Sequence, residues 1–410
     1  MKILTSNGFE YIYNPIDNCI VDEGFGFLPD LSIAFKPLEE ISELPSISFF
    51  TIGVTERCNL RCTYCCYSGA YSEHRRHSVR SLSVNQIPKI IDFILKYSTS
   101  KEITLDFYGG ESLLELNWIK RFVSEVKEIE SIVWRFEVST NGLLLTSDIV
   151  DWLVINQFKV FVSVDGIGHF HDDCRRDIKG QPTYATIERN LFYIKEHYPD
   201  YWTNNVHIMM TVHDINNLPQ IAESWEVSKL YEDKGPYRLS EVSTIYNDTT
   251  SKLEEVSELN RYLNLVEWYK DHPDNSVIST FFNIWLAEWI NRPLGVVDLE
   301  IEYPTCVPYN RKLYIDANGN IGICERISDR IRFGSIEDGI DFSILNDVRR
   351  KTASFIDQSC SSCEIARLCD ICPDILKISD VLKETYCHNQ KIMQRIKLSC
   401  FCELAENDLI

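Results

Sequence analysis

The run CNLRCTYCC at residues 58–66 places four cysteines within nine residues. Cys58, Cys62 and Cys65 have the spacing C-x3-C-x2-C, and three thiolates can each bind one iron of a cubane [4Fe–4S] cluster. The fourth iron then has no protein ligand and can bind a small molecule. A closed zinc site takes four ligands, usually in C-x2-C pairs, so the adjacent Cys65 and Cys66 suit zinc poorly. The run therefore predicts an iron–sulfur cluster with one open iron, and Cys66 is not expected to be a ligand.

The composition of the chain excludes several classes of protein. Fifteen cysteines could indicate a secreted disulfide protein, but the chain has 410 residues and starts without the apolar segment of a signal peptide. Its apolar runs are much shorter than the ~20 residues that a membrane span needs. The formal net charge of −20 repels nucleic acid. We expect a cytoplasmic enzyme with a small-molecule or peptide substrate, without nucleic-acid or membrane partners.

Between residues 48 and 215, short β-rich runs alternate with amphipathic stretches. Two of these stretches, residues 83–98 and 183–198, have helical periodicity, and Ser83 is a plausible N-cap. The β-rich runs are ISFFTIGV, EITLDFYG, VWRFEVST, KVFVSVDG and VHIMMTVH. The alternation predicts an α/β fold with a parallel sheet, either doubly wound or barrel-like, whose chemistry lies on loops after the strands. The first cysteine run follows directly after the first of these strands.

The remaining regions have different patterns. A hairpin around Asn14-Pro15 is expected in the N-terminal region, and residues 252–292 are expected to be helical. Residues 312–324 predict a second hairpin, whose Asn318-Gly319 pair suits a type I′ turn. The cysteine-rich stretch from 306 to 387 has too little regular apolar pattern for a large core. We therefore expect metal ligation to stabilise it.

These motifs resemble the radical S-adenosylmethionine (SAM) enzymes, over residues 48 to about 240. In that family, C-x3-C-x2-C follows the first strand of a partial (β/α)6 TIM-like barrel. The resemblance implies that Tyr64 packs near the adenine, that the GGE motif binds the methionine amino group and that Arg175 meets the carboxylate. The residues it assigns to SAM binding are Tyr64, Gly109, Gly110, Glu111, Ser139, Asn141, Ser163, Asp165 and Arg175.

Each implied role is chemically reasonable. An ammonium group pairs with a carboxylate such as Glu111, and a carboxylate pairs with a forked guanidinium such as Arg175. Glycines beside Glu111 allow close backbone approach to a ligand. The implied chemistry is reductive cleavage of SAM to a 5′-deoxyadenosyl radical, which abstracts hydrogen from an unactivated C–H bond. The cofactors supply this chemistry, and the protein supplies orientation and excludes water.

The second cysteine set resembles the SPASM extension of peptide-modifying radical SAM enzymes, which carries two auxiliary [4Fe–4S] clusters. The resemblance implies one cluster on Cys306, Cys324 and Cys372, and another on Cys360, Cys363, Cys369 and Cys387. The first of these lacks a fourth cysteine, which implies an open iron or a non-cysteine ligand. Taken by itself, the C-x2-C-x5-C-x2-C spacing also permits a zinc ribbon. The five other cysteines, Cys19, Cys66, Cys174, Cys400 and Cys402, are expected to be buried or incidental thiols.

These patterns divide the chain into five expected parts. They are a lead-in over 1–47 that could contact part of a leader peptide, a radical SAM partial barrel over 48–250, a helical bridge over 251–300, a SPASM domain over 301–395 and a C-terminal tail over 396–410.

The resemblance implies a peptide-modifying oxidoreductase that acts on a ribosomally made, Cys-containing precursor peptide, with flavodoxin or ferredoxin as electron donor. The context CTYCCYSGAYSEHRRHS resembles maturases that form an intramolecular link, a thioether or alternatively a carbon–carbon bond. An anaerobic sulfatase-maturing enzyme, which makes formylglycine, stays an alternative because Glu325 occupies the place of that family's acidic base. A non-enzymatic, zinc-bound interaction protein is the alternative of another class.

Overall fold

The computed structural model describes residues 1–15, 18–22, 34–69, 76–242, 252–292, 300–301, 303, 312–326, 331–369, 371–373 and 379–410. Cys306 lies outside the described residues, so its predicted role as a cluster ligand stays a prediction.

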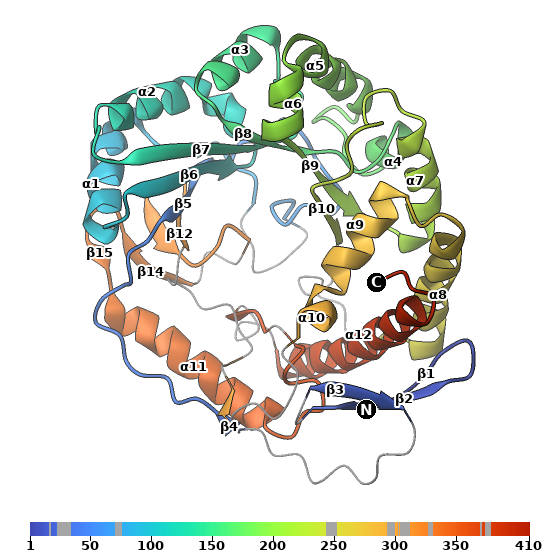
Figure 1. The fold of residues 1–410 in the computed structure, drawn as a ribbon. Coiled ribbons are helices and arrows are strands. Elements are labelled where there is room, and N and C mark those ends of the chain that lie inside the picture. The colour runs from blue at the N-terminus through green and yellow to red at the C-terminus, as the bar shows by residue number, and fades with distance from the viewer. Residues whose placement is uncertain are drawn as a thin grey trace.

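A curved ten-stranded sheet organises the chain, in the order β10-β9-β8-β7-β6-β5-β12-β13-β14-β15 (Figure 1). Its parallel strands are β5 Phe49–Thr55, β6 Glu102–Gly109, β7 Val133–Thr140, β8 Lys159–Ser163, β9 Val206–Val212, β10 Arg238–Glu241 and β12 Lys312–Ile315. Three antiparallel strands extend it, β13 Asn320–Gly322, β14 Arg332–Ser335 and β15 Gly339–Ile340. The six strands from β5 to β10 alternate with helices, which confirms the predicted α/β class and the partial (β/α)6 barrel.

Helices cover the outer side of this sheet (Figure 1). The helices that connect the barrel strands β5 to β10 are α1 Ile87–Tyr97, α2 Leu116–Lys127, α3 Ser147–Ile155, α4 His169–Asp172, α5 Tyr184–His197, α6 Pro199–Asn205 and α7 Leu218–Glu226. The same connections contain the 3₁₀ turns η1 Val84–Gln86, η2 Ser112–Glu115 and η3 Ile215–Asn217. The helices after the barrel are α8 Glu255–Asp271, α9 Ser276–Trp285, α10 Ala287–Ile290, α11 Phe342–Cys360 and α12 Asp380–Glu406.

The local signals in the sequence are largely reproduced. Ser83 accepts a hydrogen bond from the Asn85 amide at 3.1 Å and Gln86 closes a capping box, so the helical segment begins where the N-cap predicts. The short strand β10 was not among the five predicted runs, because its four residues, RLSE, carry only one buried apolar side chain.

The hairpin of β12 and β13 forms as predicted, but its turn type was predicted wrongly. A type I′ turn needs positive φ at both central residues, and of Asn318 and Gly319 only Gly319 has it, at +88°. The tight turn instead spans Asp316 to Gly319, where the Gly319 amide donates to the Asp316 carbonyl at 2.9 Å. The Asp316 Oδ1 supports it by accepting hydrogen bonds from the amides of Asn318 (2.8 Å) and Asn320 (2.9 Å).

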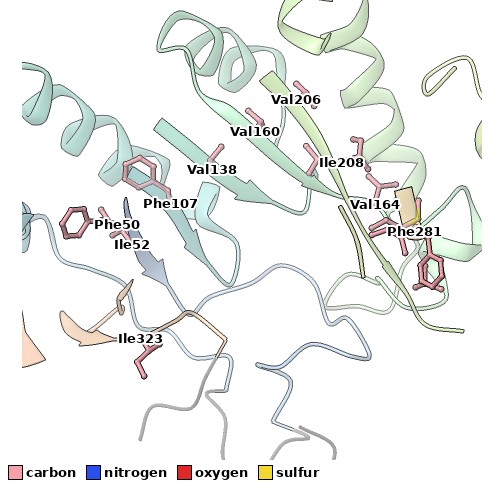
Figure 2. Packing of buried hydrophobic residues seen from close by; sticks show 14 of the residues in the cluster. Phe50, Ile52, Phe107, Val138, Val160, Val164, Val206, Ile208, Phe281 and Ile323 are labelled. Atoms are coloured by element: carbon pink, nitrogen blue, oxygen red, sulfur yellow. The ribbon is translucent and has the colours of Figure 1, made fainter. Parts of the chain in front are cut away.

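Strand alternation separates an apolar outer face of the sheet from a polar interior. Phe50 and Ile52 of β5 are fully buried on the outer face, where Phe107 of β6 packs against Phe122 of α2 with ring centroids 5.9 Å apart (Figure 2). The intervening residue Thr51 points the other way and hydrogen-bonds to Asp106. The core therefore lies between sheet and helices, which leaves the barrel interior available for polar groups.

A small antiparallel sheet stands apart from the barrel. It comprises β1 Lys2–Leu4, β2 Glu10–Asn14 and β3 Cys19–Asp22, and its β2–β3 hairpin confirms the one predicted around Asn14-Pro15. This sheet lies beside α12, whose Glu403 accepts hydrogen bonds from Ser6 (Figure 1). Two further short strands, β4 Ala34–Phe35 and β11 Glu300–Ile301, pair with each other.

Helix α12 runs without a break through residues 395 and 396, where the sequence suggested the end of a domain. Within the described residues, no helix is both long enough and apolar enough to span a membrane.

Candidate functional site

A cavity of about 310 Å³ opens where the parallel strands end. Its wall collects many of the residues that the sequence assigned to cofactor binding. Those that line it are Cys58, Cys62, Tyr64, Cys65, Gly109, Gly110, Ser139, Asn141, Ser163 and Arg175. The carboxyl ends of adjacent parallel strands meet at one edge of a sheet, so residues separated by more than a hundred positions share this cavity.

The three thiols of the first cysteine run converge on one side of this cavity. Burial, with a smaller contribution from neighbouring thiols, raises the pKa of Cys62 to about 11 and that of Cys58 to about 12. Backbone amides point at two of the sulfurs. The Leu60 amide lies 3.4 Å from Cys58 Sγ, and the Tyr67 amide lies 3.4 Å from Cys65 Sγ. Crowded thiols with raised pKa values lose their protons when a metal group binds them.

The donor set of this loop fits an iron–sulfur cluster. Among the described residues, no three His, Cys, Asp or Glu side chains are arranged around one metal ion. Three thiolates can each bind a separate iron of a cubane cluster. The amide contacts fit as well, because amide-to-sulfur hydrogen bonds are among the contacts that tune such clusters.

The two glycines of the GGE motif bring backbone against the cysteine loop. A Cβ atom on Gly110 would lie 2.2 Å from the carbonyl oxygen of Arg57, and one on Gly109, whose φ is +150°, would lie 2.3 Å from that of Thr55. A side chain at either position would therefore push the cysteine loop away. Both glycines line the cavity, so their backbone is what the motif presents to a ligand.

Glu111 has a different environment from the one its implied role suggests. Its carboxylate is buried and accepts hydrogen bonds from Thr140 Oγ1 (2.7 Å) and from the amides of Asn141 (2.7 Å) and Leu113 (3.1 Å). It is not among the residues that line the described cavity. In this structure Glu111 joins the loop after β6 to the end of β7, and its contact with the SAM ammonium stays a prediction.

Asp165 connects four segments around the cavity. Its Oδ2 accepts hydrogen bonds from the Tyr64 hydroxyl and, at 2.6 Å, from Arg175 Nε, and its Oδ1 accepts one from the Thr211 amide at 2.9 Å. Arg175 Nη1 reaches to 3.8 Å from Cys62 Sγ. The buried carboxylate therefore fixes the guanidinium that the sequence assigned to SAM, together with the cysteine loop and β9.

A second polar group lies inside the barrel below this cavity. Lys312 Nζ lies 2.7 Å from the Glu325 carboxylate, and the Tyr67 hydroxyl donates a hydrogen bond to the Glu325 main-chain oxygen. Burial disfavours ionisation of Glu325, but the Lys312 ammonium outweighs it and lowers the pKa below its ordinary value. Glu325 is therefore ionised at neutral pH. It is not part of the described cavity lining, whereas the next residue, Arg326, is.

Asp106 is the other carboxyl in this interior. It is buried, its Oδ2 accepts a hydrogen bond from Thr51 at 3.1 Å, and its Oδ1 has no hydrogen-bond partner among the described residues. Burial, followed by the charge of Glu325, raises its pKa to about 7. An unsatisfied buried carboxylate is costly, so the protonated form is the stable one below that pH.

This raised pKa predicts a pH-dependent stability that Asp106→Asn should remove. Between its ordinary pKa of 3.8 and about 7, the folded protein holds a proton that the unfolded chain has lost. The free energy of unfolding therefore falls as pH rises through that window, by about 2–4 kcal/mol from this group. Urea denaturation of the apoprotein at pH 5 and pH 8 measures the free energy of unfolding. We expect Asp106→Asn to become more stable relative to the wild type at pH 8 than at pH 5. Asp148→Asn, on the exposed face of α3, serves as control. If the free energy of unfolding changes equally between pH 5 and pH 8 for Asp106→Asn and the wild type, the raised pKa of Asp106 is wrong.

Part of the second cysteine set also comes together. Cys360 ends α11, Cys363 follows it and Cys387 lies in α12. Burial, together with the nearby thiols of Cys363 and Cys387, raises the pKa of Cys360 to about 12. Burial and the Cys363 thiol likewise raise the pKa of Cys387. Cys324 follows β13, and Cys369 and Cys372 lie between α11 and α12. Three of the four cysteines assigned to one auxiliary cluster are thus neighbours.

Several cavity residues escaped the sequence reasoning. They are Tyr108, Phe161, Met209, Met210, Thr211, Arg238, Ser240, Glu241, Val242 and Arg326, together with His77, whose Nε2 lies 3.9 Å from Cys65 Sγ. Most of them lie at or near strand ends, and this position was the feature of the sequence that could have identified them as cavity residues. Position alone does not distinguish a residue that faces the cavity from one that faces a helix.

A partial (β/α)6 barrel with three cysteines, a glycine pair and an arginine around one cavity defines the class of protein. Residues 52–224 match the Radical SAM superfamily. The radical SAM cyclopropyl synthase TigE of Paramaledivibacter caminithermalis is 26% identical over 397 residues, which are 90% of this chain and 79% of that protein. The cysteine-type anaerobic sulfatase-maturating enzyme of Clostridium perfringens is 22% identical over 369 residues, 85% of this chain and 95% of that one.

Solved structures agree on the fold. Native anSMEcpe with bound AdoMet superposes with a TM-score of 0.64 at 18% identity, covering 88% of this chain and 100% of that one. Residues 52–224 therefore form a radical SAM domain, and the family implies an enzyme that uses SAM and a [4Fe–4S] cluster. The resemblance seen in the sequence is confirmed for this domain.

Proposed function

We propose that this protein is a radical SAM peptide maturase that abstracts hydrogen from a precursor peptide and forms an intramolecular cross-link, most simply a thioether from a cysteine sulfur to carbon. When bound, the cluster and SAM supply a 5′-deoxyadenosyl radical. Cys58, Cys62 and Cys65 would hold the cluster, the backbone of Gly109 and Gly110 with Arg175 would hold the methionine end of SAM, and Tyr64 would support the adenine.

One observation carries this proposal. The cavity lined by the three thiols and Arg175 is also lined by Met209, Thr211 and Ser240 of β9 and β10, so it offers side chains beyond those assigned to the cluster and SAM. These additional side chains mix apolar and polar groups, as expected for a peptide site. The two curated relatives, a cyclopropyl synthase and a sulfatase-maturating enzyme, support a maturase of some kind.

A second candidate function is formylglycine formation by a sulfatase-maturating enzyme. The ionised pair of Glu325 and Lys312, at the place of that family's acidic base, favours it. A solved complex of anSMEcpe with bound AdoMet and the Cp18Cys peptide has a similar fold, with a TM-score of 0.62. The comparisons support this candidate as well as they support the cross-linking maturase.

The proposal includes two auxiliary clusters and an electron donor such as flavodoxin or ferredoxin. The proximity of Cys360, Cys363 and Cys387 supports one auxiliary cluster, with Cys369 as its fourth ligand. The other would use Cys306, Cys324 and Cys372 and keep an open or non-cysteine position. Iron and sulfide analysis of anaerobically purified protein tests this composition, and a colourless zinc protein would end the whole proposal.

The deciding experiment is anaerobic incubation with SAM, dithionite and the small peptide encoded beside this protein, followed by mass spectrometry. Loss of two hydrogen atoms per link without an aldehyde supports the cross-link. An aldehyde that reacts with hydrazine supports formylglycine, and deuterium uptake without mass loss indicates epimerisation. An unchanged peptide, with 5′-deoxyadenosine still formed, would contradict both candidates for that peptide.

Glu325→Gln separates a role in substrate chemistry from a role in SAM cleavage. If the carboxylate accepts a proton from the substrate, its loss should lower peptide modification about 100-fold, the usual contribution of a general base, while SAM cleavage continues. Glu337→Gln is the matched control, because Glu337 is exposed and pairs with Lys89. Equal losses of both products would show that Glu325 only supports the structure.

A further inference from the structure

Two arginines line the cavity, and neither guanidinium is hydrogen-bonded within the described residues. Arg238 begins β10 and Arg326 follows β13, and both side chains are exposed. Exposed arginines without hydrogen bonds are ordinary on an outer surface, but here two of them face one cavity.

The carboxylates around this cavity are already engaged. Glu241 accepts a hydrogen bond from the Tyr262 hydroxyl at 2.6 Å, Glu325 pairs with Lys312 and Asp165 pairs with Arg175. Partial burial lowers the pKa of Arg238 and the positive charge of Arg326 lowers it further, whereas the charge of Glu325 raises the pKa of both arginines. Because the Glu325 carboxylate is hydrogen-bonded to Lys312, a second anion between the two guanidiniums would further relieve their repulsion.

The position of the pair differs from that of the residues assigned to SAM. Strand β10 ends the parallel half of the sheet, whereas β13 belongs to its antiparallel extension, and the curvature of the sheet brings both to the same cavity (Figure 1). Arg326 lies near Tyr108, Glu325 and Cys66, each of which raises the pKa of its guanidinium. Ser163 and Ser139 lie at the ends of the intervening strands β8 and β7, and Arg175 follows α4.

We infer that Arg238 and Arg326 form a subsite for a carboxylate of the substrate peptide, placed beside the reacting residue. This inference rests on the proposed function, since it assigns a contact with the substrate peptide in the same cavity. A carboxylate accepts hydrogen bonds from forked guanidiniums in a fixed orientation, so the pair would fix the register of the peptide. The carboxylate can come from an acidic side chain or from the peptide C-terminus.

Binding of small probes tests the subsite without requiring turnover. The probes are N-acetyl-glutamate N-methylamide and N-acetyl-glutamine N-methylamide for the side chain, and N-acetyl-glycylglycine and its amide for the C-terminus. Each is titrated by saturation-transfer NMR into the anaerobic holoenzyme with SAM. We expect one carboxylate probe to bind at least about fivefold more tightly than its amide, and Arg238→Gln or Arg326→Gln each to weaken it about fivefold.

Controls keep the test specific. Arg121→Gln removes an exposed arginine of α2 and should change nothing, and Arg326→Lys, which keeps charge but loses the fork, should give an intermediate affinity. Whichever carboxylate probe responds identifies the source. Equal binding of carboxylate and amide probes would overturn the subsite, as would variants that alter the cluster EPR spectrum but not probe binding. Failure of peptide modification in the mass-spectrometric assay would count against the maturase function alone, since probe binding is measured separately.

Discussion

Cys62→Ala is expected to abolish the cluster and SAM cleavage together. Cys62 lies on the cavity wall, its thiol pKa is raised to about 11 by burial, and Arg175 reaches toward its sulfur at 3.8 Å. Loss of even an outer-shell partner costs a metal site 10–100-fold, so loss of a ligand should lower 5′-deoxyadenosine formation by more than about 100-fold. Anaerobic reconstitution, visible absorption and EPR measure the cluster, and chromatography measures 5′-deoxyadenosine.

Cys66→Ala is the matched control, since Cys66 lines the same cavity one residue after Cys65. We expect that variant to keep the cluster spectrum and most of the SAM cleavage. If Cys66→Ala loses the cluster and Cys62→Ala keeps it, the ligand assignment from the C-x3-C-x2-C spacing is wrong. The proposed auxiliary clusters would contribute iron to both variants, so the readout is the signal that changes when SAM is added.

Asp165→Ala is expected to destabilise the fold as well as the site. Asp165 is 3% exposed and Arg175 is 9% exposed, and their ion pair is 2.6 Å long. Removing one partner leaves the other charge buried and unpaired, which typically costs about 3–5 kcal/mol. Urea denaturation of the apoprotein measures this loss. The variant should also bind SAM more weakly, because Tyr64 and Arg175 lose the acceptor that orients them.

A double-mutant cycle identifies the cause of that loss. Asp173→Ala is the control for the single variants. Asp173 is exposed and its ion pair with Arg176 is long, at 3.9 Å, so its loss should change the free energy of unfolding by less than about 1 kcal/mol. The double variant Asp165→Ala/Arg175→Ala should be less destabilised than the sum of the single variants, because it leaves no unpaired charge. Additive losses would show that the pair is not coupled.

Local sequence signals predicted the elements that depend on neighbouring residues. The strands β6 and β7 coincide with the predicted runs because alternation of side chains along a strand is a local property. The capping box at Ser83 is equally local, since its donors and acceptors lie within three residues. The turn type after β12 was predicted wrongly because Asp316, outside the Asn-Gly pair, accepts hydrogen bonds from the amides of Asn318, Gly319 and Asn320 through its side chain and carbonyl.

The candidate site was predicted in part for a related reason. A short motif such as C-x3-C-x2-C fixes which thiols can act together, but it does not fix where a long side chain points. Glu111 turns toward Thr140 and Asn141, and Asp165 binds Arg175 rather than facing the cavity. Those orientations depend on strands that are distant in sequence.

The sequence by itself determined the class of fold and the cysteine loop, because strand periodicity, caps and cysteine spacing are written within a few residues. Only the tertiary structure decided which groups share the cavity and which charges are matched within it. Glu325 with Lys312, Asp165 with Arg175, and the cavity-lining Arg238 and Arg326 come from separate segments that the fold brings together. Coulombic interaction and burial depend on distance in space, which a linear pattern does not contain.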